Sequence, residues 1–408
     1  MPEQSQENKI PKNIKRAGKW VWCAAIVIVI GAIICCLLWT AGLWKLQTVD
    51  EQLTAIEATR AIPNEENAAI IYNVLLQDAN ATSLLDTRPG FLDDDSDNLT
   101  ARQPWSGKDF PELAVWIKEQ QHVIDRLLEA SKFDKCRFPI AIDPVQRSQP
   151  SQPCWAMRKW TFLLRRAANN DIGEGRIDDA IDKWRCLIQM GNHLRQQPLF
   201  VEYLVAIAIE AVALNQTAVF LVEGSADETH LRKLETLPLH TEDDWTAVLE
   251  EVLPAEELYE QKMKENLGLL DRLKYEFGYG LFASMKGPAL DRIREIYRRK
   301  LATSRGLHIL VALRRYRNKH GRWPEGLDDI QSQVPEEMLI DPFNSGNFVY
   351  KLTDNAFKLY SKGKNNVDED GRYRDPQDDW MIWPPRSRKT KNEKADTQQS
   401  KTQKEVVK

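Results

Sequence analysis

The feature that most constrains this chain is a run of 25 residues without a charged or histidine side chain, from Trp20 to Trp44. As a helix it would reach about 37 Å, at about 1.5 Å per residue, which is enough to cross the hydrocarbon core of a bilayer. Tryptophans stand at both ends of the run, where interfacial anchors are expected, and aliphatic residues fill its middle. The run predicts a transmembrane helix over residues 20–44.

The charges on either side of this run predict its orientation. Residues 1–19 carry five Lys or Arg and two Glu, whereas residues 45–60 carry two basic and three acidic side chains. By the positive-inside rule, the basic N-terminus stays in the cytoplasm and the chain after residue 45 is exported. The run is longer than the apolar part of a cleaved signal peptide and has no A-x-A-like site. We therefore expect an uncleaved, single-pass signal-anchor in a bacterial inner membrane, with the following domains periplasmic.

A second apolar stretch covers residues 199–222, but Glu202 and Glu210 interrupt it. A carboxylate near the bilayer centre costs about 2.5 to 3.5 kcal/mol on insertion scales. We therefore expect a buried helix of the exported part here.

Composition excludes some classes of partner and activity. The net charge is −4 and the basic residues are spread along the chain, so we expect no nucleic-acid partner. The sequence contains none of the patterns H-E-x-x-H, G-x-S-x-G, G-x-G-x-x-G or a P-loop. It therefore predicts no catalytic residues and no enzyme.

Residues 45–300 have mainly helical patterns, and we expect an all-α exported domain of helical hairpins. Its segment "GRIDDAIDKW" (175–184) resembles the G-x4-A core of a tetratricopeptide unit, although no second copy follows at that period. Cys136 and Cys154 could close a Pro-rich loop through a disulfide in an oxidising compartment, and the sequence leaves this open. Cys186 is expected to be buried in a helix. The polar tail 386–408 is expected to be disordered.

The sequence pattern changes after residue 301, from helical segments alone to a helix followed by strands. A helical pattern ends at "GRWP" (321–324), "DPFNSGNFVYKL" predicts a turn into a strand, and "AFKLYSKG" predicts its partner strand across a turn at Asp354 and Asn355. The acidic loop "SKGKNNVDEDGRYRDPQDDW" (361–380) follows.

This order resembles the globular domain of the major pseudopilin of type II secretion systems, over residues 302–383. The matching residues are Ala312, Leu313, Tyr316, Gly321, Pro324, Leu327, Asp341, Pro342, Phe343, Tyr350, Tyr360, Ser361, Gly363, Asp378 and Asp379. The resemblance implies a small C-terminal α+β domain with a short antiparallel sheet over residues 301–385. The remainder is similar to uncharacterised membrane-anchored bacterial proteins.

The same resemblance implies a structural calcium ion in the acidic loop, with Asp368, Asp370, Asp378 and Asp379 as its ligands. Calcium takes about six to eight oxygens in a flexible geometry, which a loop of aspartates and a glycine can supply. Glu369 and Asp375 are expected to be solvated neighbours. The loop is not an EF-hand, because Gln377 stands where a bidentate Glu is required.

The sequence therefore predicts a single-pass, membrane-anchored envelope protein with a noncatalytic binding or structural role and a calcium-stabilised C-terminal domain. Its expected partners are the membrane and envelope or secretion-system proteins. The first alternative is an accessory component that docks on a type II secretion or pilus-like assembly, and the second is an uncharacterised hydrolase.

Overall fold

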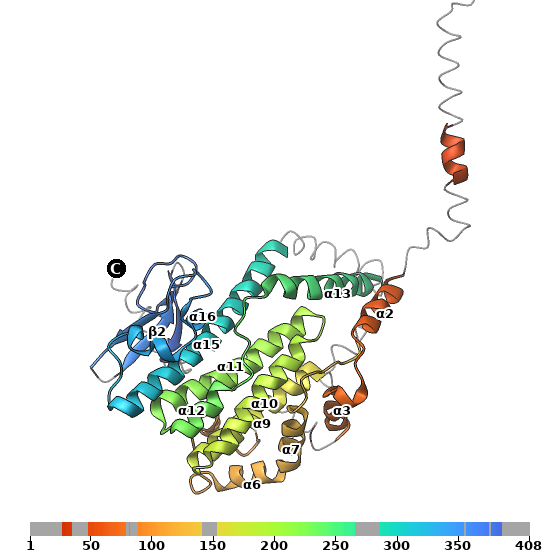
Figure 1. Ribbon diagram of the computed structural model, residues 1–408. Helices are drawn as coiled ribbons and strands as arrows, with labels where there is room; N and C mark the ends of the chain where they lie inside the picture. The colour runs from red at the N-terminus through yellow and green to blue at the C-terminus, as the bar shows by residue number, and fades with distance from the viewer. Residues whose placement is uncertain are drawn as a thin grey trace, which may run out of the picture. The chain divides into compact units, whose positions relative to one another are not determined.

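The computed structural model describes residues 27–34, 48–78, 81, 89–140, 153–265, 286–354, 356–374 and 377–385. Contacts divide the chain into two compact units, Met1–Thr54 and Ala55–Lys408. The fold is mainly α-helical with a small antiparallel sheet near the C-terminus (Figure 1), so the fold class is confirmed in these coarse terms. The predicted segment 1–19, most of the predicted membrane helix 20–44, Asp375 and the tail 386–408 lie outside the described residues.

The elements are, in chain order, α2 (Val49–Thr59), η1 (Asn64–Glu66), α3 (Ala69–Gln77), α5 (Asp94–Arg102), α6 (Pro111–Glu119), α7 (Gln121–Ala130), α9 (Pro153–Gly173), α10 (Ile177–Arg195), α11 (Phe200–Glu223), α12 (Glu228–Glu235), α13 (Trp245–Glu265), α15 (Lys286–His320), η2 (Leu327–Gln333), α16 (Glu336–Leu339), β1 (Val349–Leu352), β2 (Phe357–Ser361), β3 (Tyr373–Arg374), β4 (Gln377–Asp378) and β5 (Trp380–Trp383).

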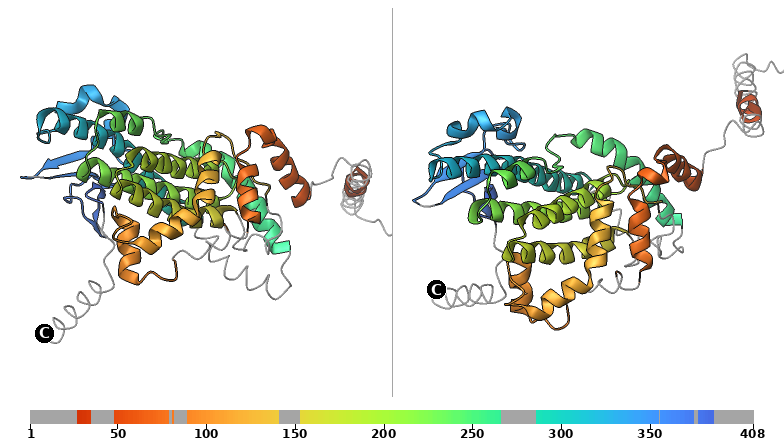
Figure 2. Two further views of the ribbon diagram at one scale, coloured as in Figure 1. Left: turned by 90° about the horizontal axis from the view of Figure 1, so that it is seen from below. Right: turned by 60° about the horizontal axis from the view of Figure 1, so that its bottom comes forward.

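Helices α9, α10 and α11 lie side by side at the centre of the helical part (Figures 1 and 2). A tight turn folds α10 back on α9, with Gly175 at φ +77°, in the left-handed region that glycine enters without a steric cost. The Arg176 amide donates a hydrogen bond to the Asp171 carbonyl at 2.7 Å, and its guanidinium pairs with the Asp171 carboxylate at 2.8 Å. These contacts close the predicted helical hairpin.

Helix α11 is apolar almost all round. Among the described helices it alone is long and apolar enough to cross a membrane by length and composition. However, 67% of its most apolar window is buried inside the protein, against α9, α10 and α15. The prediction of a buried helix over residues 199–222 is confirmed.

Glu210 lies in the middle of α11 with none of its surface exposed. Its carboxylate pairs with Arg195 of α10 at 2.8 Å and with Lys300 of α15 at 2.9 Å. Gly191 leaves the space for it, because a Cβ there would lie 2.4 Å from Glu210 Cγ. Burial lowers the pKa of Lys300 to about 8, against the opposing effect of Glu210. This buried ion triad joins three helices.

Helix α15 belongs to both the helical part and the sheet. Arg315 in its C-terminal half pairs with Glu228 and Glu235 of α12 at 3.0 and 2.6 Å. At Gly306, a Cβ would lie 2.7 Å from the side chain of Ile382 in β5, so the glycine lets the sheet pack directly on the helix. One hydrophobic core consequently continues from the helical part into the sheet. The boundary predicted between residues 300 and 301 falls inside α15.

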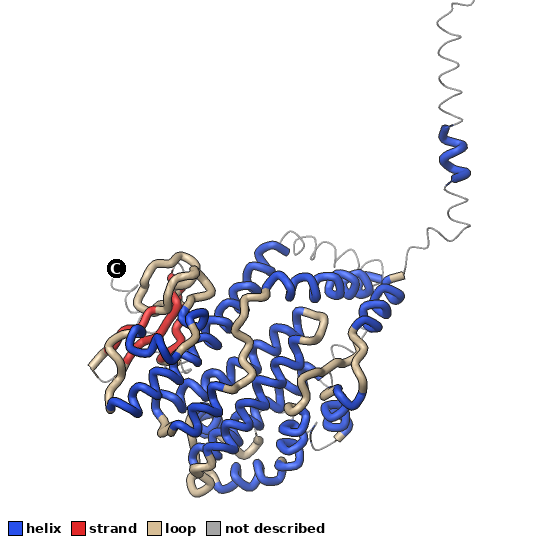
Figure 3. The backbone as a smooth tube through the Cα atoms, viewed as in Figure 1, coloured by secondary structure: helices blue, strands red, loops and turns tan. Residues whose placement is uncertain are grey.

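The main sheet has the order β1-β2-β5, with all neighbours antiparallel. Figure 3 shows the strands, in red, grouped in one part of the molecule. The predicted hairpin is confirmed, with Tyr350 opposite Leu359. The sequence did not indicate β5, because its four residues have no polar alternation and follow a loop. Pairing with β2 and the hydrogen bond from the Trp380 indole to Thr303 Oγ1 of α15, at 3.0 Å, hold it in place.

Three cysteines in the described part of the chain, Cys136, Cys154 and Cys186, are buried. Cys136 is a free thiol, so no bridge to Cys154 is formed. Cys186 lies in α10 as predicted, and burial raises the pKa of its thiol to about 12.

We expect Lys300→Met to lower the free energy of unfolding by about 3 kcal/mol, because it leaves the Glu210 carboxylate buried with one cation fewer. Urea titration of the detergent-solubilised full chain measures this. Lys319→Met, on the exposed end of the same helix, is the control and should stay within about 0.5 kcal/mol of the wild type. Equal losses in the two variants would contradict a structural role for the triad.

Candidate metal centre

The acidic loop begins at a turn organised by Asp341, whose side chain has no exposed surface. Its carboxylate accepts hydrogen bonds from the Phe343 amide at 3.0 Å and from the Lys362 amide at 3.2 Å, after the end of β2. Asn344 bridges the two segments, because its side-chain amide donates to Asp341 at 2.9 Å and to the Gly363 carbonyl at 3.0 Å. The D-P-F segment thus fixes the point where the loop leaves the sheet.

Left-handed residues then turn the loop back on itself. Gly363, Asn366, Asp370 and Gly371 have φ values of +65°, +55°, +61° and +78°. Asn and Asp tolerate this region better than other side chains, whereas a larger residue is strained there. The chain returns through the short β3–β4 pair, in which Tyr373 lies opposite Asp378. The start and the end of the loop therefore lie close together.

Two of the four predicted ligands turn toward the sheet. Asp368 pairs with Lys351 of β1 at 2.9 Å and accepts a hydrogen bond from Tyr360 of β2 at 2.6 Å. Asp370 pairs with Lys358 of β2 at 2.7 Å and with Lys351 at 3.3 Å. Burial alone would raise the pKa of Asp368, but the hydrogen bonds from Tyr360 and Lys351 outweigh it and lower the pKa to about 2. These carboxylates are already neutralised by lysines.

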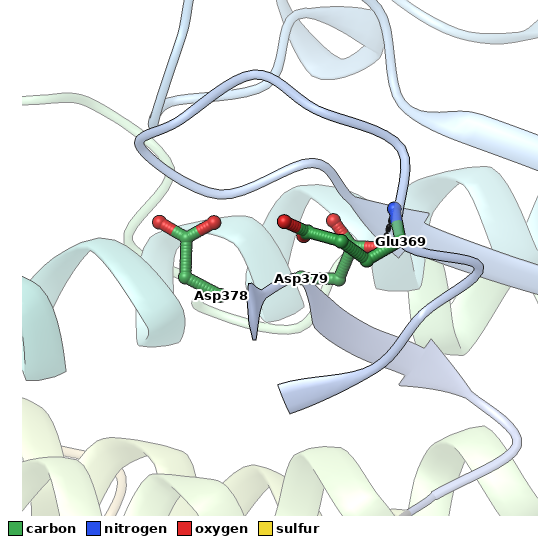
Figure 4. Close-up of side chains that lie close together, drawn as sticks. All are labelled: Glu369, Asp378 and Asp379. Atoms are coloured by element: carbon green, nitrogen blue, oxygen red, sulfur yellow. Dashed lines mark hydrogen bonds between the residues drawn. The ribbon is translucent and has the colours of Figure 1, made fainter. Parts of the chain in front are cut away.

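The other two predicted ligands, Asp378 and Asp379, converge with Glu369. One carboxylate oxygen from each lies within 4.8 Å of those of the other two, and Figure 4 shows the three side chains turned toward one another beneath the loop. This acidic triad could hold a metal ion. Asp379 is fully buried, and its Oδ2 accepts hydrogen bonds from the amides of Glu369 at 2.9 Å and Gly371 at 2.8 Å.

Two oxygens of the triad are poorly satisfied by the protein itself. Asp378 uses Oδ2 to accept hydrogen bonds from the Lys364 and Asn365 amides at 2.8 and 3.3 Å, while Glu369 Oε1 accepts one from Asn365 at 2.6 Å. Asp378 Oδ1 and Glu369 Oε2 are buried and have no hydrogen-bond partner among the described residues. Burying a carboxylate oxygen without a partner is costly, so a cation placed between these oxygens would relieve the cost.

Electrostatics around Asp379 point the same way. Burial, together with the neighbouring Glu369 carboxylate, raises the pKa of Asp379 to about 6, although two backbone amides oppose this effect. Like charges held close together disfavour the ionised pair. Binding of a proton or of a metal cation would remove this repulsion.

Of the four ligands that the sequence predicts, the structure groups Asp378 and Asp379, and it adds Glu369, for which the sequence predicts only a solvated neighbour. No signal in the neighbouring residues singles out Glu369, because Asp370 lies in a left-handed turn and not in an extended chain whose side chains would alternate. The lysines at 351 and 358 on the predicted hairpin decide which side is neutralised. No family model, curated protein or solved structure matches this chain.

Gly363→Ala should lower the free energy of unfolding by about 3 kcal/mol. The reason is that its Cβ would lie 2.4 Å from both the carbonyl oxygen and a carboxylate oxygen of Asp378. Gly321→Ala is the matched control, since Gly321 has φ +74° but nothing within 4 Å of its Cβ position. In the control, the free energy of unfolding should fall by only about 1 kcal/mol, which is the cost of placing alanine in the left-handed region. Equal losses, measured by urea titration, would show that Asp378 is not held against Gly363.

In chelator, the stability of the wild type relative to Asp379→Asn should fall as the pH rises. The pKa of Asp379 in the folded chain lies above the unfolded value of about 3.9, so its stabilising contribution is complete below about pH 4 and is lost through about pH 6. Urea titrations at a series of pH values measure the difference. A difference that stays constant between about pH 4 and pH 7 would contradict the raised pKa.

Proposed function

We propose that this chain is a single-pass, membrane-anchored envelope protein with a noncatalytic binding or structural role, whose C-terminal sheet and acidic loop are stabilised by calcium. The observation that carries the calcium part is the convergence of Glu369, Asp378 and Asp379, with buried oxygens on Glu369 and Asp378 that have no hydrogen-bond partner among the described residues. Glu369 comes from the middle of the loop and Asp378 and Asp379 from its end, so an ion between them cross-links the loop.

The donor set favours calcium over other metals. It consists only of carboxylate oxygens, which suit hard cations, and includes no histidine or cysteine that zinc would prefer. Several left-handed residues bend the loop around the site, so its oxygens are not arranged as a regular octahedron. Calcium accepts such irregular geometry better than magnesium does. Asp379 has no exposed surface, which suits a structural ion better than a site for a substrate.

The anchor is supported by residues 27–34. They are helical, and six of their side chains (Val27, Ile28, Val29, Ile30, Ile33 and Ile34) each leave at least 50% of their surface exposed. A helix that is apolar on all sides suits a lipid environment, and this one lies in the middle of the charge-free run 20–44. We infer that the run spans the membrane with the N-terminus in the cytoplasm and residues after 45 in the periplasm.

The resemblance to the pseudopilin domain supports an extracytoplasmic C-terminal part, and by itself it also allows docking on a type II secretion or pilus-like assembly. No geometry among the described residues favours that role over a stand-alone envelope protein. Nor does this geometry favour a hydrolase, since one of the three grouped carboxylates, that of Asp379, has no exposed surface.

Calcium should raise the melting temperature of the full chain. With free calcium about tenfold above a dissociation constant near 0.1 mM, linkage adds about 1.4 kcal/mol, which corresponds to about 2 to 4 °C. Calorimetry of the solubilised protein in millimolar calcium and in chelator measures the shift. Asp378→Asn should abolish the shift, while Asp354→Asn, in the exposed hairpin turn, should keep it. Identical melting temperatures of the wild type in both buffers would contradict the calcium proposal.

Protease added outside spheroplasts should digest the part of the chain after residue 45 and leave an epitope tag at the N-terminus intact. Ile30→Arg combined with Ile33→Arg should release the chain from the membrane fraction, because two central charges cost about 5 kcal/mol on insertion scales. The pair Ile30→Leu and Ile33→Leu is the control and should stay in the membrane fraction. Protection of the C-terminal part in sealed spheroplasts would overturn the orientation.

A further inference from the structure

The helical part contains a groove that the proposed function does not use. It has a volume of about 490 Å³ and lies between the α6–α7 and α9–α10 helix pairs. This volume is within the range of sites that take small ligands, about 300 to 1,000 Å³. No residue of the sheet or of the acidic loop lines it, so it is separate from the candidate metal centre. Residues of the "GRIDDAIDKW" segment form one of its sides.

Part of the groove wall is apolar and well packed. Ile117 of α6 and Ile124 of α7 are buried, and Leu128 of α7 is half-buried, while Ala114 and Ala167 leave space between them. Such a wall suits the methylene groups of an aliphatic chain.

The buried charges of the groove are already paired with one another. Lys183 of α10 lies 2.6 Å from the Asp171 carboxylate, and both side chains are more than nine-tenths buried. Arg176 also pairs with Asp171 and donates a hydrogen bond to Asn170 at 2.9 Å. These two cations are therefore satisfied without a ligand, and they do not form an anion site.

Three lining charges have no ion-pair partner among the described residues, and the carboxylates of Asp125 and Asp182 outnumber the one cation, Lys118. Asp125 of α7 and Asp182 of α10 are exposed and line the groove from its two sides. Asp125 accepts a hydrogen bond from the Gln121 amide at 2.8 Å. No lysine or arginine in the described part of the chain pairs with either carboxylate. Together the lining side chains carry four carboxylates against three cations, so the groove as a whole favours a positive group.

We propose that this groove binds a primary ammonium group carried on an aliphatic chain, with the ammonium at Asp125 and Asp182 and the methylene groups on the wall formed by Ile117 and Leu128. The same chemistry is offered by a free alkyl diamine and by a lysine side chain of a peptide. An organic anion is disfavoured, because Lys183 and Arg176 are already paired with Asp171, and Lys118 is outnumbered by the two unpaired rim carboxylates.

Calorimetric titration of the solubilised full chain tests the proposal with two matched pairs of probes. The first pair is 1,5-diaminopentane and its neutral analogue 1,5-pentanediol. The second is a capped pentapeptide with a central lysine and the same peptide with norleucine. Binding of an ammonium probe without binding of its neutral analogue supports the site, and the pair that shows it identifies a free amine or a peptide as the source.

Variants locate the binding. Asp125→Asn and Asp182→Asn should each weaken the ammonium probe about tenfold, since each removes one charge partner in a partly desolvated groove. Glu119→Gln removes an exposed carboxylate of α6 that does not line the groove, and it should leave the affinity unchanged. Equal weakening by all three variants, equal binding of ammonium and neutral probes, or no heat for any probe at about 10 mM would overturn the proposal.

Discussion

A carboxylate in the middle of an apolar helix has to be neutralised where it lies, and in this protein that requirement organises the fold. Glu210 interrupts the most apolar helix of the described chain and is fully buried. Its two cations come from different helices, Arg195 from α10 and Lys300 from α15. Moving either partner helix would leave the Glu210 carboxylate buried without one of its cations, which is strongly destabilising. The triad therefore sets the positions of α10 and α15 against α11.

The position of α15 in turn carries the sheet and the acidic loop. Arg299, the residue before Lys300, lies over the rings of Tyr373 and Trp380, at 4.4 and 5.0 Å from their centres. Four residues earlier, Glu295 pairs with Lys364 of the loop at 3.0 Å. One turn of α15 thus contacts the helical core on one side and both ends of the loop on the other. The candidate metal centre is built on the same helix that Glu210 holds.

The sequence predicts best where the signal is local. The β1–β2 hairpin follows from alternating residues and its turn, and the buried helix 199–222 follows from Glu202 and Glu210 within an apolar run. The partners of the acidic residues do not follow from the local sequence. Asp368 and Asp370 pair with Lys351 and Lys358, which come close to them only in the folded hairpin. Glu369 could not be assigned from its neighbours in sequence, since its role depends on the side of the loop that these lysines leave free. The strand β5 is likewise defined by its partner and by α15 rather than by its own pattern.

Charge balance decides how the acidic loop can bind a cation. In the sequence, Asp368 and Asp370 lie near Asp378 and Asp379. Four carboxylates so close along the chain suggest a site with high affinity for a cation. The lysine pairs remove two of those charges and tie that side of the loop to the sheet before any ion arrives. What is left is a smaller site, with Glu369 replacing the two lost ligands and with oxygens held by backbone amides. A site of this kind is preformed, so a cation has to offset little ordering of the loop and acts on stability mainly by relieving the repulsion between buried carboxylates.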